Sequence, residues 1–297
     1  MSYAQYSELR KSALDSVLSV LPTALKEALF LLGDGKAIFS DGLSEIRARV
    51  GEVSLAVFSG VNLPIRVRLD KKDLADTVSR IHSGALYMHK ESMSQGFLSM
   101  EYGVRVGIVG TYYEGLAGDI TGLVFRIPFF CFEIGQKLRE VIEDRGALRS
   151  ALIYSPPAVG KTTAIRSLAL ALSAGGIRRV AVVDERREFP SCLAEHACLD
   201  ILSGYKKDFG IEVATRVLNP EIIIIDELGN EKEAEAVLFA VSHGVPVVAT
   251  AHATNEEELF LRPKLKELIK SRAFEIPIAL YRQGRKYGFC VSEWSDI

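Results

Sequence analysis

Residues 151–163 read Ala-Leu-Ile-Tyr-Ser-Pro-Pro-Ala-Val-Gly-Lys-Thr-Thr, and this stretch is the strongest indication of the fold. An apolar run precedes the loop, and an amphipathic stretch from Thr163 to Leu172 follows it. Strand, tight loop and helix are the setting in which G-K-[ST] binds phosphate, because backbone N–H groups of the loop and of the helix N-terminus point at the anion. The predicted phosphate-binding loop consists of Ser155, Pro156, Pro157, Ala158, Val159, Gly160, Lys161, Thr162 and Thr163.

Two side chains of this loop are expected to contact a nucleotide and its metal. Lys161 is predicted to reach the β- and γ-phosphates of ATP, and the Thr162 hydroxyl is predicted to ligate Mg²⁺. The first glycine of the full G-x-x-x-x-G-K-[ST] pattern is replaced by Ser155. Taken alone, the motif therefore leaves open an ordinary strand-to-helix turn with an N-terminal lysine.

An acidic element follows the phosphate-binding loop later in the sequence. Residues 221–229 read Glu-Ile-Ile-Ile-Ile-Asp-Glu-Leu-Gly. Four consecutive isoleucines are typical of a strand buried on both faces of a parallel sheet. At the end of such a strand, Asp226 is predicted to hold Mg²⁺ through water and Glu227 to polarise the attacking water. A buried strand with a polar end is the alternative for this run alone, but the two elements together favour nucleotide hydrolysis.

The composition of the chain favours some classes of protein and excludes others. The chain has 297 residues, 48% of them hydrophobic and 25% charged, which is globular and long enough for two cores. The net charge of −2 gives no overall basic field, so nucleic acid is not favoured as a partner. Cys192, His196 and Cys198 lack a visible fourth ligand, so zinc is not favoured either. No apolar run approaches the roughly 20 residues of a membrane span, and we expect a cytoplasmic protein that only a partner could hold at a membrane.

The pattern along the chain predicts two domains. Residues 1–132 show helical periodicity over 5–32, with a break at Pro22, and then short strands and one helix from Asp70 or Lys71 to about His82, which indicates an α+β domain. Residues 133–297 show strand–helix alternation and predict a doubly wound, mostly parallel sheet with a closing hairpin at 283–286. In this second domain we expect a helix over 133–149, strands at 151–154, 179–184, 221–226, 245–250, 275–281 and 287–292, and further helices at 162–174, 208–218, 231–243 and 255–272.

Polar residues follow further strands of the predicted sheet. Asp184 and Glu185 end one strand, and His252 ends another. Because ligands of open α/β sheets bind beyond the carboxyl ends of the strands, we expect these side chains to converge with Asp226 and Glu227 beside the phosphate loop. Each taken singly could equally be a surface residue or a structural histidine.

Arginines on the predicted N-terminal strands allow two interpretations. Alternating arginines are typical of a solvated strand face. Alternatively, some of them reach the γ-phosphate or a neighbouring subunit, as arginine fingers do. Arg105 and Arg126, near the predicted domain junction, are the candidates for this second role, and the full set is Arg47, Arg49, Arg66, Arg68, Arg105 and Arg126.

Together these residues resemble the secretion ATPase superfamily of types II and IV, and most closely its stage III sporulation protein AA branch. The resemblance covers nearly the whole chain and rests on the phosphate loop, on Val183–Arg186, on Arg216–Pro220 followed by Ile225–Gly229, and on Ala249–His252. One departure is Ala158, where the branch commonly carries glycine. A Cβ there is expected to crowd the nucleotide or to demand a different loop conformation.

The resemblance implies a RecA-like P-loop ATPase domain behind an α+β domain. It implies ATP and Mg²⁺ as ligands, Glu227 as catalytic base, Glu185 as an assisting group and His252 as a sensor of the γ-phosphate. It further implies a homo-oligomer, a hexameric ring, that powers a mother cell–forespore channel or secretion complex from the cytoplasmic side through membrane-embedded partners. A nucleic-acid-stimulated RecA-like motor and a non-hydrolysing nucleotide-gated scaffold remain alternatives.

Overall fold

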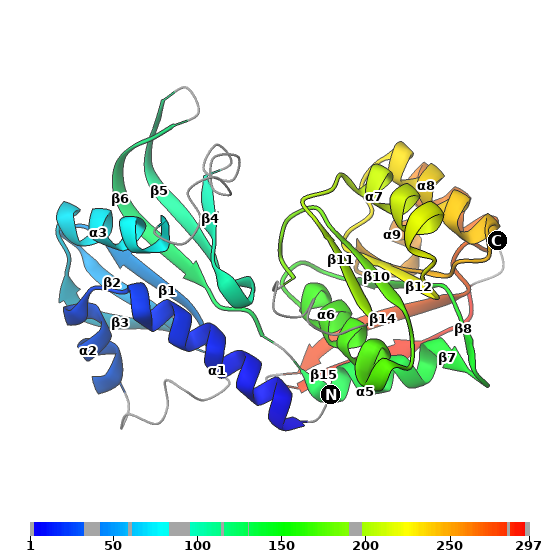
Figure 1. Cartoon of the computed structure of the whole chain (residues 1–297), viewed down its shortest axis with the longest axis horizontal. Helices are drawn as coiled ribbons and strands as arrows, with labels where there is room; N and C mark the ends of the chain where they lie inside the picture. The colour runs from blue at the N-terminus through cyan, green and yellow to red at the C-terminus, as the bar shows by residue number, and fades with distance from the viewer. Residues whose placement is uncertain are drawn as a thin grey trace. The chain divides into compact units, whose positions relative to one another are not determined.

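A computed structural model describes residues 3–32, 42–58, 61–82, 96–113, 116–129, 131–189, 198–283 and 286–294. The chain divides into two compact units, one formed by Ser7–Phe129 and the other by Met1–Tyr6 with Phe130–Ile297 (Figure 1). Each unit has its own sheet and its own hydrophobic core. Within the described ranges, no helix combines the length and the apolar character that a bilayer crossing requires.

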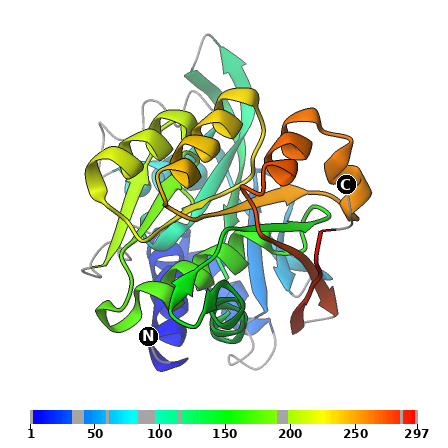
Figure 2. The same cartoon turned by 90° about the vertical axis from the view of Figure 1, so that its right-hand side faces the viewer.

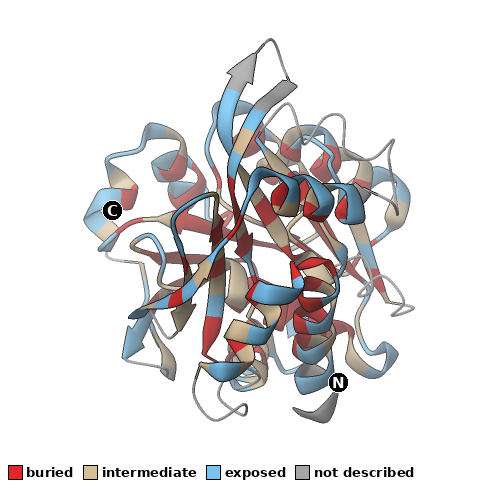
Figure 3. Cartoon of the chain, turned by 90° about the vertical axis from the view of Figure 1, so that its left-hand side faces the viewer, coloured by how far each residue is buried: buried red, intermediate tan, exposed pale blue. Residues whose placement is uncertain are grey.

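The first unit is built on a six-stranded antiparallel sheet of order β3-β2-β1-β6-β5-β4. Helices α1 and α2, separated at Pro22 as expected, pack with the sheet and α3 around one core, whose buried positions are red in Figure 3. Proline separates the helices because its ring and missing N–H disrupt helical hydrogen bonding. The elements are α1 (Tyr3–Val20), α2 (Thr23–Leu31), β1 (Leu43–Arg49), β2 (Val53–Phe58), β3 (Val61–Arg68), α3 (Lys71–His82), β4 (Phe97–Ser99), a short 3₁₀ turn (Glu101–Gly103), β5 (Arg105–Tyr113) and β6 (Leu116–Arg126).

The second unit is built on a seven-stranded sheet of order β11-β10-β12-β13-β9-β14-β15. Six strands are parallel, and β15 closes the sheet as the antiparallel partner of β14, with Gln283 opposite Lys286. This closing hairpin confirms the one predicted at 283–286. The strands are β9 (Ala151–Ser155), β10 (Val180–Asp184), β11 (Leu199–Ser203), β12 (Ile222–Ile225), β13 (Val247–His252), β14 (Ile276–Gln283) and β15 (Lys286–Val291).

Helices cover both faces of this sheet, which explains the continuous apolar runs of its strands (Figure 2). One strand face, which includes Leu152, Val183 and Ile223, forms a core with α7, α8, α9 and α10. The other face is covered by α5 and α6 (Figure 1). The helices are α5 (Phe132–Ile142), α6 (Lys161–Ser173), α7 (Lys207–Val213) with a π-helical turn at Ala214–Leu218, α8 (Glu231–Ser242), α9 (Glu256–Phe260) and α10 (Pro263–Lys270).

Three segments of this unit differ from the sequence-based expectation. The predicted helix over 133–149 ends at Ile142 and gives way to a small hairpin of β7 (Glu143–Asp144) and β8 (Ala147–Leu148). The predicted helix over 255–272 is interrupted before Pro263, which takes the first turn of α10. Strand β11 was not predicted at all. The first helix ends because Arg145 and Gly146 adopt positive φ and form the turn of the hairpin. The second is interrupted because Pro263 lacks the N–H that would continue α9.

A cluster of ion pairs joins the amino ends of the parallel strands. Arg178, just before β10, donates to Glu143 (Nε to Oε1, 3.1 Å) and to Glu221 (Nη1 to Oε1, 2.9 Å). It also donates to the carbonyl of Gly146 at 2.6 Å, and Arg139 pairs with Glu143 at 3.0 Å. The hydrogen bond from Arg178 lowers the pKa of Glu143, and the backbone N–H of Arg179 lowers the pKa of Glu221. This clamp ties the β7–β8 hairpin to the ends of β10 and β12.

Candidate active site

The loop between β9 and α6 has the backbone expected of an anion-binding turn. Gly160 caps α6 with φ 117° and ψ 30°, a conformation that residues with a Cβ rarely adopt. Ala158 has φ 62° and is exposed, so it takes the left-handed conformation that a glycine would take more easily. The alanine therefore stores backbone strain in the loop.

Lys161 lies at the centre of the loop and is 6% exposed. Its Nζ atom donates to the Ser155 carbonyl (2.9 Å), the Ser155 hydroxyl (3.3 Å) and the Pro156 carbonyl (3.2 Å), and it contacts Nδ1 of His252 at 2.8 Å. Burial lowers the pKa of Lys161, while Asp226 and Glu227 act in the opposite direction. Because an ammonium group only donates, Nδ1 of His252 accepts this bond and the ring proton lies on Nε2.

Asp226 is held in place by three donors at the end of β12. Thr162 Oγ1 donates to its Oδ2 atom at 3.0 Å, and Thr250 Oγ1 donates to its Oδ1 atom at 2.8 Å. The backbone N–H of Glu227 also donates to Oδ1, at 2.9 Å, and to the Thr250 hydroxyl. Thr162 and Asp226 thus present hydroxyl and carboxylate oxygens side by side, which is the donor chemistry that Mg²⁺ prefers.

Glu227 faces the same edge of the sheet and is half-buried. Its Oε1 atom lies 3.5 Å from Nε2 of His252, and its Oε2 atom lies 3.6 Å from Nη1 of Arg186. His252 therefore contacts Lys161 with one ring nitrogen and Glu227 with the other. Arg262 donates to the carbonyl of His252 at 2.7 Å and fixes the end of β13. The structure thus brings together Lys161, Thr162, Asp226, Glu227 and His252.

Glu185 belongs to the site through an intermediary, Lys207. Lys207 is 7% exposed, and its Nζ atom donates to the carbonyl of Glu227 at 2.6 Å. The same atom forms ion pairs with Glu185 at 3.7 Å and with the buried Glu233 at 3.6 Å. Glu233 in turn accepts from the backbone N–H of Gly229 at 2.7 Å. The buried Lys207 therefore joins the acidic motif at the end of β10, which includes Glu185, to the one after β12, which includes Glu227.

Asp184 does not turn toward the phosphate loop as its position at a strand end suggested. Its carboxylate accepts the backbone N–H groups of Glu188 and Phe189, each at 2.8 Å, and so caps the turn after β10. Burial raises the pKa of Asp184 to about 6, although these two hydrogen bonds and the nearby Arg166 act against the shift. Its role is to hold this turn.

The remaining expected residues lie elsewhere. Arg105 and Arg126 are cross-strand neighbours on β5 and β6 of the first unit, and the Arg105 guanidinium lies 4.2 Å from the ring centre of Phe97. Their predicted role in a neighbouring subunit stays a prediction. Cys192 and His196, considered above as zinc ligands, lie outside the described residues.

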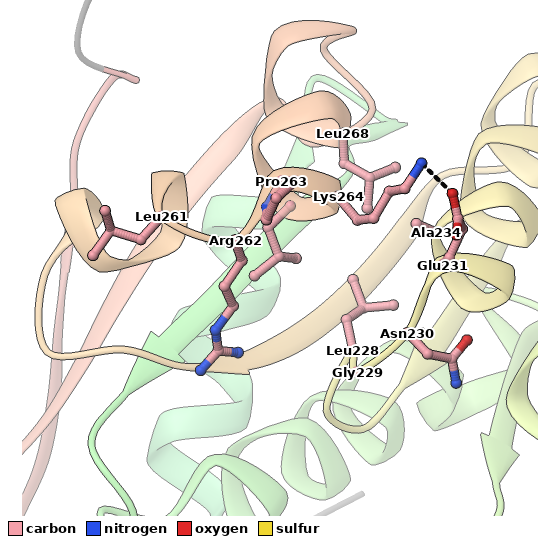
Figure 4. A pocket seen from close by; sticks show the side chains of 11 residues that line it. Leu228, Gly229, Asn230, Glu231, Ala234, Leu261, Arg262, Pro263, Lys264 and Leu268 are labelled. Atoms are coloured by element: carbon pink, nitrogen blue, oxygen red, sulfur yellow. Dashed lines mark ion pairs between the residues drawn. The ribbon is translucent and has the colours of Figure 1, made fainter.

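A pocket of about 270 Å³ is lined by residues that follow Glu227 and by residues of α8 and α10 (Figure 4). Leu228 and Leu268 contribute to its apolar lining, and Lys264 pairs with Glu231 at its rim with a distance of 2.6 Å. Arg262 lines the pocket and also donates to the carbonyl of His252. Arg262 therefore belongs both to the pocket wall and to the candidate site.

Sequence reasoning missed several residues that build the site. Lys207 and Glu233 are buried in helices and carry no motif, so no local signal marks them. Arg262 precedes a proline, which marks a helix start but not a contact with His252. Tyr287, on β15, lies against the phosphate loop, since a Cβ at Gly160 would overlap its ring. Its location follows only from the order of strands in the sheet.

Comparison with known proteins agrees with this architecture. The family model described as "Sporulation stage III, protein AA" matches residues 15–289. The chain is 29% identical over 284 residues to stage III sporulation protein AA of Bacillus subtilis (strain 168), and the match covers 91% of each chain.

Solved structures show the same fold at low sequence identity. The pilus retraction motor PilT, solved with bound ADP, matches 90% of this chain and 83% of its own with a TM-score of 0.63 and 17% identity. The ATPase DotB of Legionella pneumophila matches 84% of this chain and 76% of its own with a TM-score of 0.56 and 16% identity. The predicted fold class, α/β with a mostly parallel sheet that follows an α+β unit in the sequence, is confirmed.

Proposed function

Because the chain belongs to the sporulation stage III protein AA family, we propose that it is a Mg²⁺-dependent ATPase that drives a channel or secretion assembly between mother cell and forespore. One observation carries the enzymatic part of the proposal. Lys161, the Thr162–Asp226 pair and the Glu227–His252 pair meet at the carboxyl edge of the parallel sheet. The likeness to PilT, which was solved with ADP, supports a nucleotide as the ligand.

The phosphate-binding role falls to Lys161 and the N-terminus of α6. The ammonium contacts the carbonyl oxygens of Ser155 and Pro156 and Nδ1 of His252. Phosphate oxygens are stronger acceptors than these groups because they carry charge. In the proposed complex, Lys161 contacts the β- and γ-phosphates, and His252 beside it contacts the γ-phosphate.

The metal-binding role falls to Thr162 and Asp226. Their oxygens lie 3.0 Å apart, and Thr250 keeps the carboxylate oriented. A bound Mg²⁺ would neutralise developing phosphate charge. The chain's own contribution is to hold the Thr162 hydroxyl and the Asp226 carboxylate side by side.

Glu227 is the proposed general base. It is half-buried beside Asp226 and is contacted by His252 and Arg186. A carboxylate held in this way can accept a proton from an attacking water molecule. Glu185 supports it indirectly, because Lys207 joins the Glu185 carboxylate to the Glu227 backbone.

A phosphate-release assay on the purified full chain tests the proposal. Wild type is expected to release phosphate from ATP only with Mg²⁺ present. Lys161→Ala is expected to lower the rate at least about a hundredfold, since a group that stabilises transition-state charge contributes that much. Single-stranded DNA or RNA is expected to leave the rate unchanged, in line with the net charge of −2. Undiminished turnover in folded Lys161→Ala protein would mean that this loop is not the active site.

A ring of identical subunits is part of the proposal, with Arg105 or Arg126 reaching the nucleotide of a neighbour. Family membership and the arginine-rich strands of the first unit support it. Mixing Arg105→Ala protein with Lys161→Ala protein is expected to restore part of the activity that each lacks alone. Sedimentation velocity with a non-hydrolysable analogue measures the assembly directly. A chain that stays monomeric with nucleotide, yet hydrolyses at full rate, contradicts the ring.

A further inference from the structure

The proposed function fixes the direction in which a bound nucleotide runs across the sheet. Lys161 and Thr162 face His252 and Asp226, which end β13 and β12 on one side of β9. The γ-phosphate end of the ligand therefore points toward β13 and β12. The α-phosphate and the nucleoside must leave on the other side of β9, where β14 and β15 lie.

An aromatic ring lies on that side, against the phosphate loop. Tyr287 is the second residue of β15, and it is half-buried. A Cβ at Gly160 would overlap its ring, so ring and loop backbone are in direct contact. Burial raises the pKa of Tyr287, while Arg282 and a hydrogen bond with the Thr163 side chain act against the shift. Tyr287 thus contacts the loop at Gly160 and Thr163.

Arg282 completes the surface beside this ring. It is the cross-strand partner of Tyr287 on β14, and its guanidinium carbon lies 5.4 Å from the centre of the Tyr287 ring. Arg282 is exposed, so a ligand can reach the guanidinium. Aromatic rings and guanidinium planes both stack on nucleobases. A tyrosine and an arginine beside the nucleoside end of a phosphate loop are the groups that a base-stacking platform needs.

We propose that Arg282 and Tyr287 form the nucleobase subsite of this protein, a platform that stacks on the base without reading its hydrogen-bonding edge. The proposal rests on the proposed nucleotide-binding function and adds to it the position and selectivity of the base. Every nucleobase has a π-face, so stacking is tolerant of base identity. The protein therefore binds ATP and GTP with similar affinity, and it binds both more tightly than inorganic tripolyphosphate.

Equilibrium binding of ATP, GTP and tripolyphosphate to the full chain, with Mg²⁺ present, tests the platform. Tyr287→Leu is expected to weaken ATP and GTP binding about tenfold or more, the loss typical of one stacked base. Tripolyphosphate has no base, so its affinity is expected to stay unchanged. Tyr287→Phe keeps the ring and is expected to keep most of the ATP affinity. Arg282→Leu gives a second measurement of the same loss if Tyr287→Leu does not fold.

Tyr281→Leu is the matched control. Tyr281 lies on the same hairpin, is 44% exposed and packs over Gly288, and its side chain alternates with Arg282 to the opposite face. Its replacement is expected to leave all three affinities unchanged. Equal loss of ATP and tripolyphosphate in Tyr287→Leu, or no loss in either platform variant, overturns the base subsite. Wild type that binds none of the three ligands overturns the proposed function instead.

Discussion

Replacing Lys207 with methionine should destabilise the second unit far more than its place outside any motif suggests. Its ammonium donates to the Glu227 carbonyl and pairs with the buried Glu233. A hydrogen bond to a charged group contributes about 1.5–3 kcal/mol. Glu233 keeps its bonds from Gly229 and Asn230, so Lys207→Met leaves no wholly unpaired charge. We expect a loss of about 2–3 kcal/mol in the free energy of unfolding, below the figure for a fully orphaned buried ion.

The chain offers a selective probe for this measurement. Its single tryptophan, Trp294, belongs to the second unit and donates to the carbonyl of Phe274 at 2.8 Å. Urea unfolding followed by tryptophan fluorescence therefore reports on the unit that contains Lys207. Lys206→Met is the matched control, because Lys206 is exposed, and it should change stability by less than about 0.5 kcal/mol.

A double-mutant cycle isolates the ion pair itself. Glu233→Gln combined with Lys207→Met should cost less than the sum of the two single changes, by about 1 kcal/mol or more. The reasoning is refuted if Lys207→Met is as stable as Lys206→Met, or if the double variant is additive within about 0.5 kcal/mol.

Three further predictions concern the loop and the strand ends. Ala158→Gly should stabilise the second unit by up to about 1 kcal/mol in the same urea assay, because φ 62° strains alanine, and a destabilised variant would contradict the strain. The pKa of Asp184 is about 6 in the folded protein and lower in the unfolded chain, so its contribution to stability falls as pH rises from about 4 to 6. Asp184→Asn removes this titration and should therefore gain stability relative to wild type over that pH range. A stability difference that does not change with pH would refute this. Glu227→Gln should bind ATP without turnover in the phosphate-release assay, while Glu185→Gln should keep measurable turnover; the reverse order would exchange their roles.

The sequence predicts the strands of the second unit well where a strand consists almost entirely of apolar residues. The four isoleucines of β12 are typical of a strand buried on both faces, and they are followed directly by Asp226 and Glu227 of the candidate site. The phosphate loop is equally local, because its glycine and lysine act through their own backbone and side chain. These parts of the site need no information from the rest of the chain.

The remaining parts depend on contacts that the sequence pattern does not reveal, most of them between distant segments. Strand β11 reads Leu-Asp-Ile-Leu-Ser and becomes a strand only because β10 offers it a parallel partner. Asp184 ends a strand in the same manner as Asp226, yet the following turn captures its carboxylate. Lys207 enters the site because α7 lies beside both acidic motifs. The break before Pro263 and the turn at Arg145–Gly146, by contrast, had visible local signals.

The clamp around Arg178 lies at the amino ends of the strands, whereas every candidate catalytic side chain lies at their carboxyl ends. The residues of the clamp are thus distinct from the candidate catalytic residues. Loosening the clamp, for instance through Glu221, touches no group of the site. Such a change offers a temperature-sensitive allele, active in cool cells and lost on warming. The effect of losing this protein at a chosen time could then be studied without altering its candidate catalytic residues.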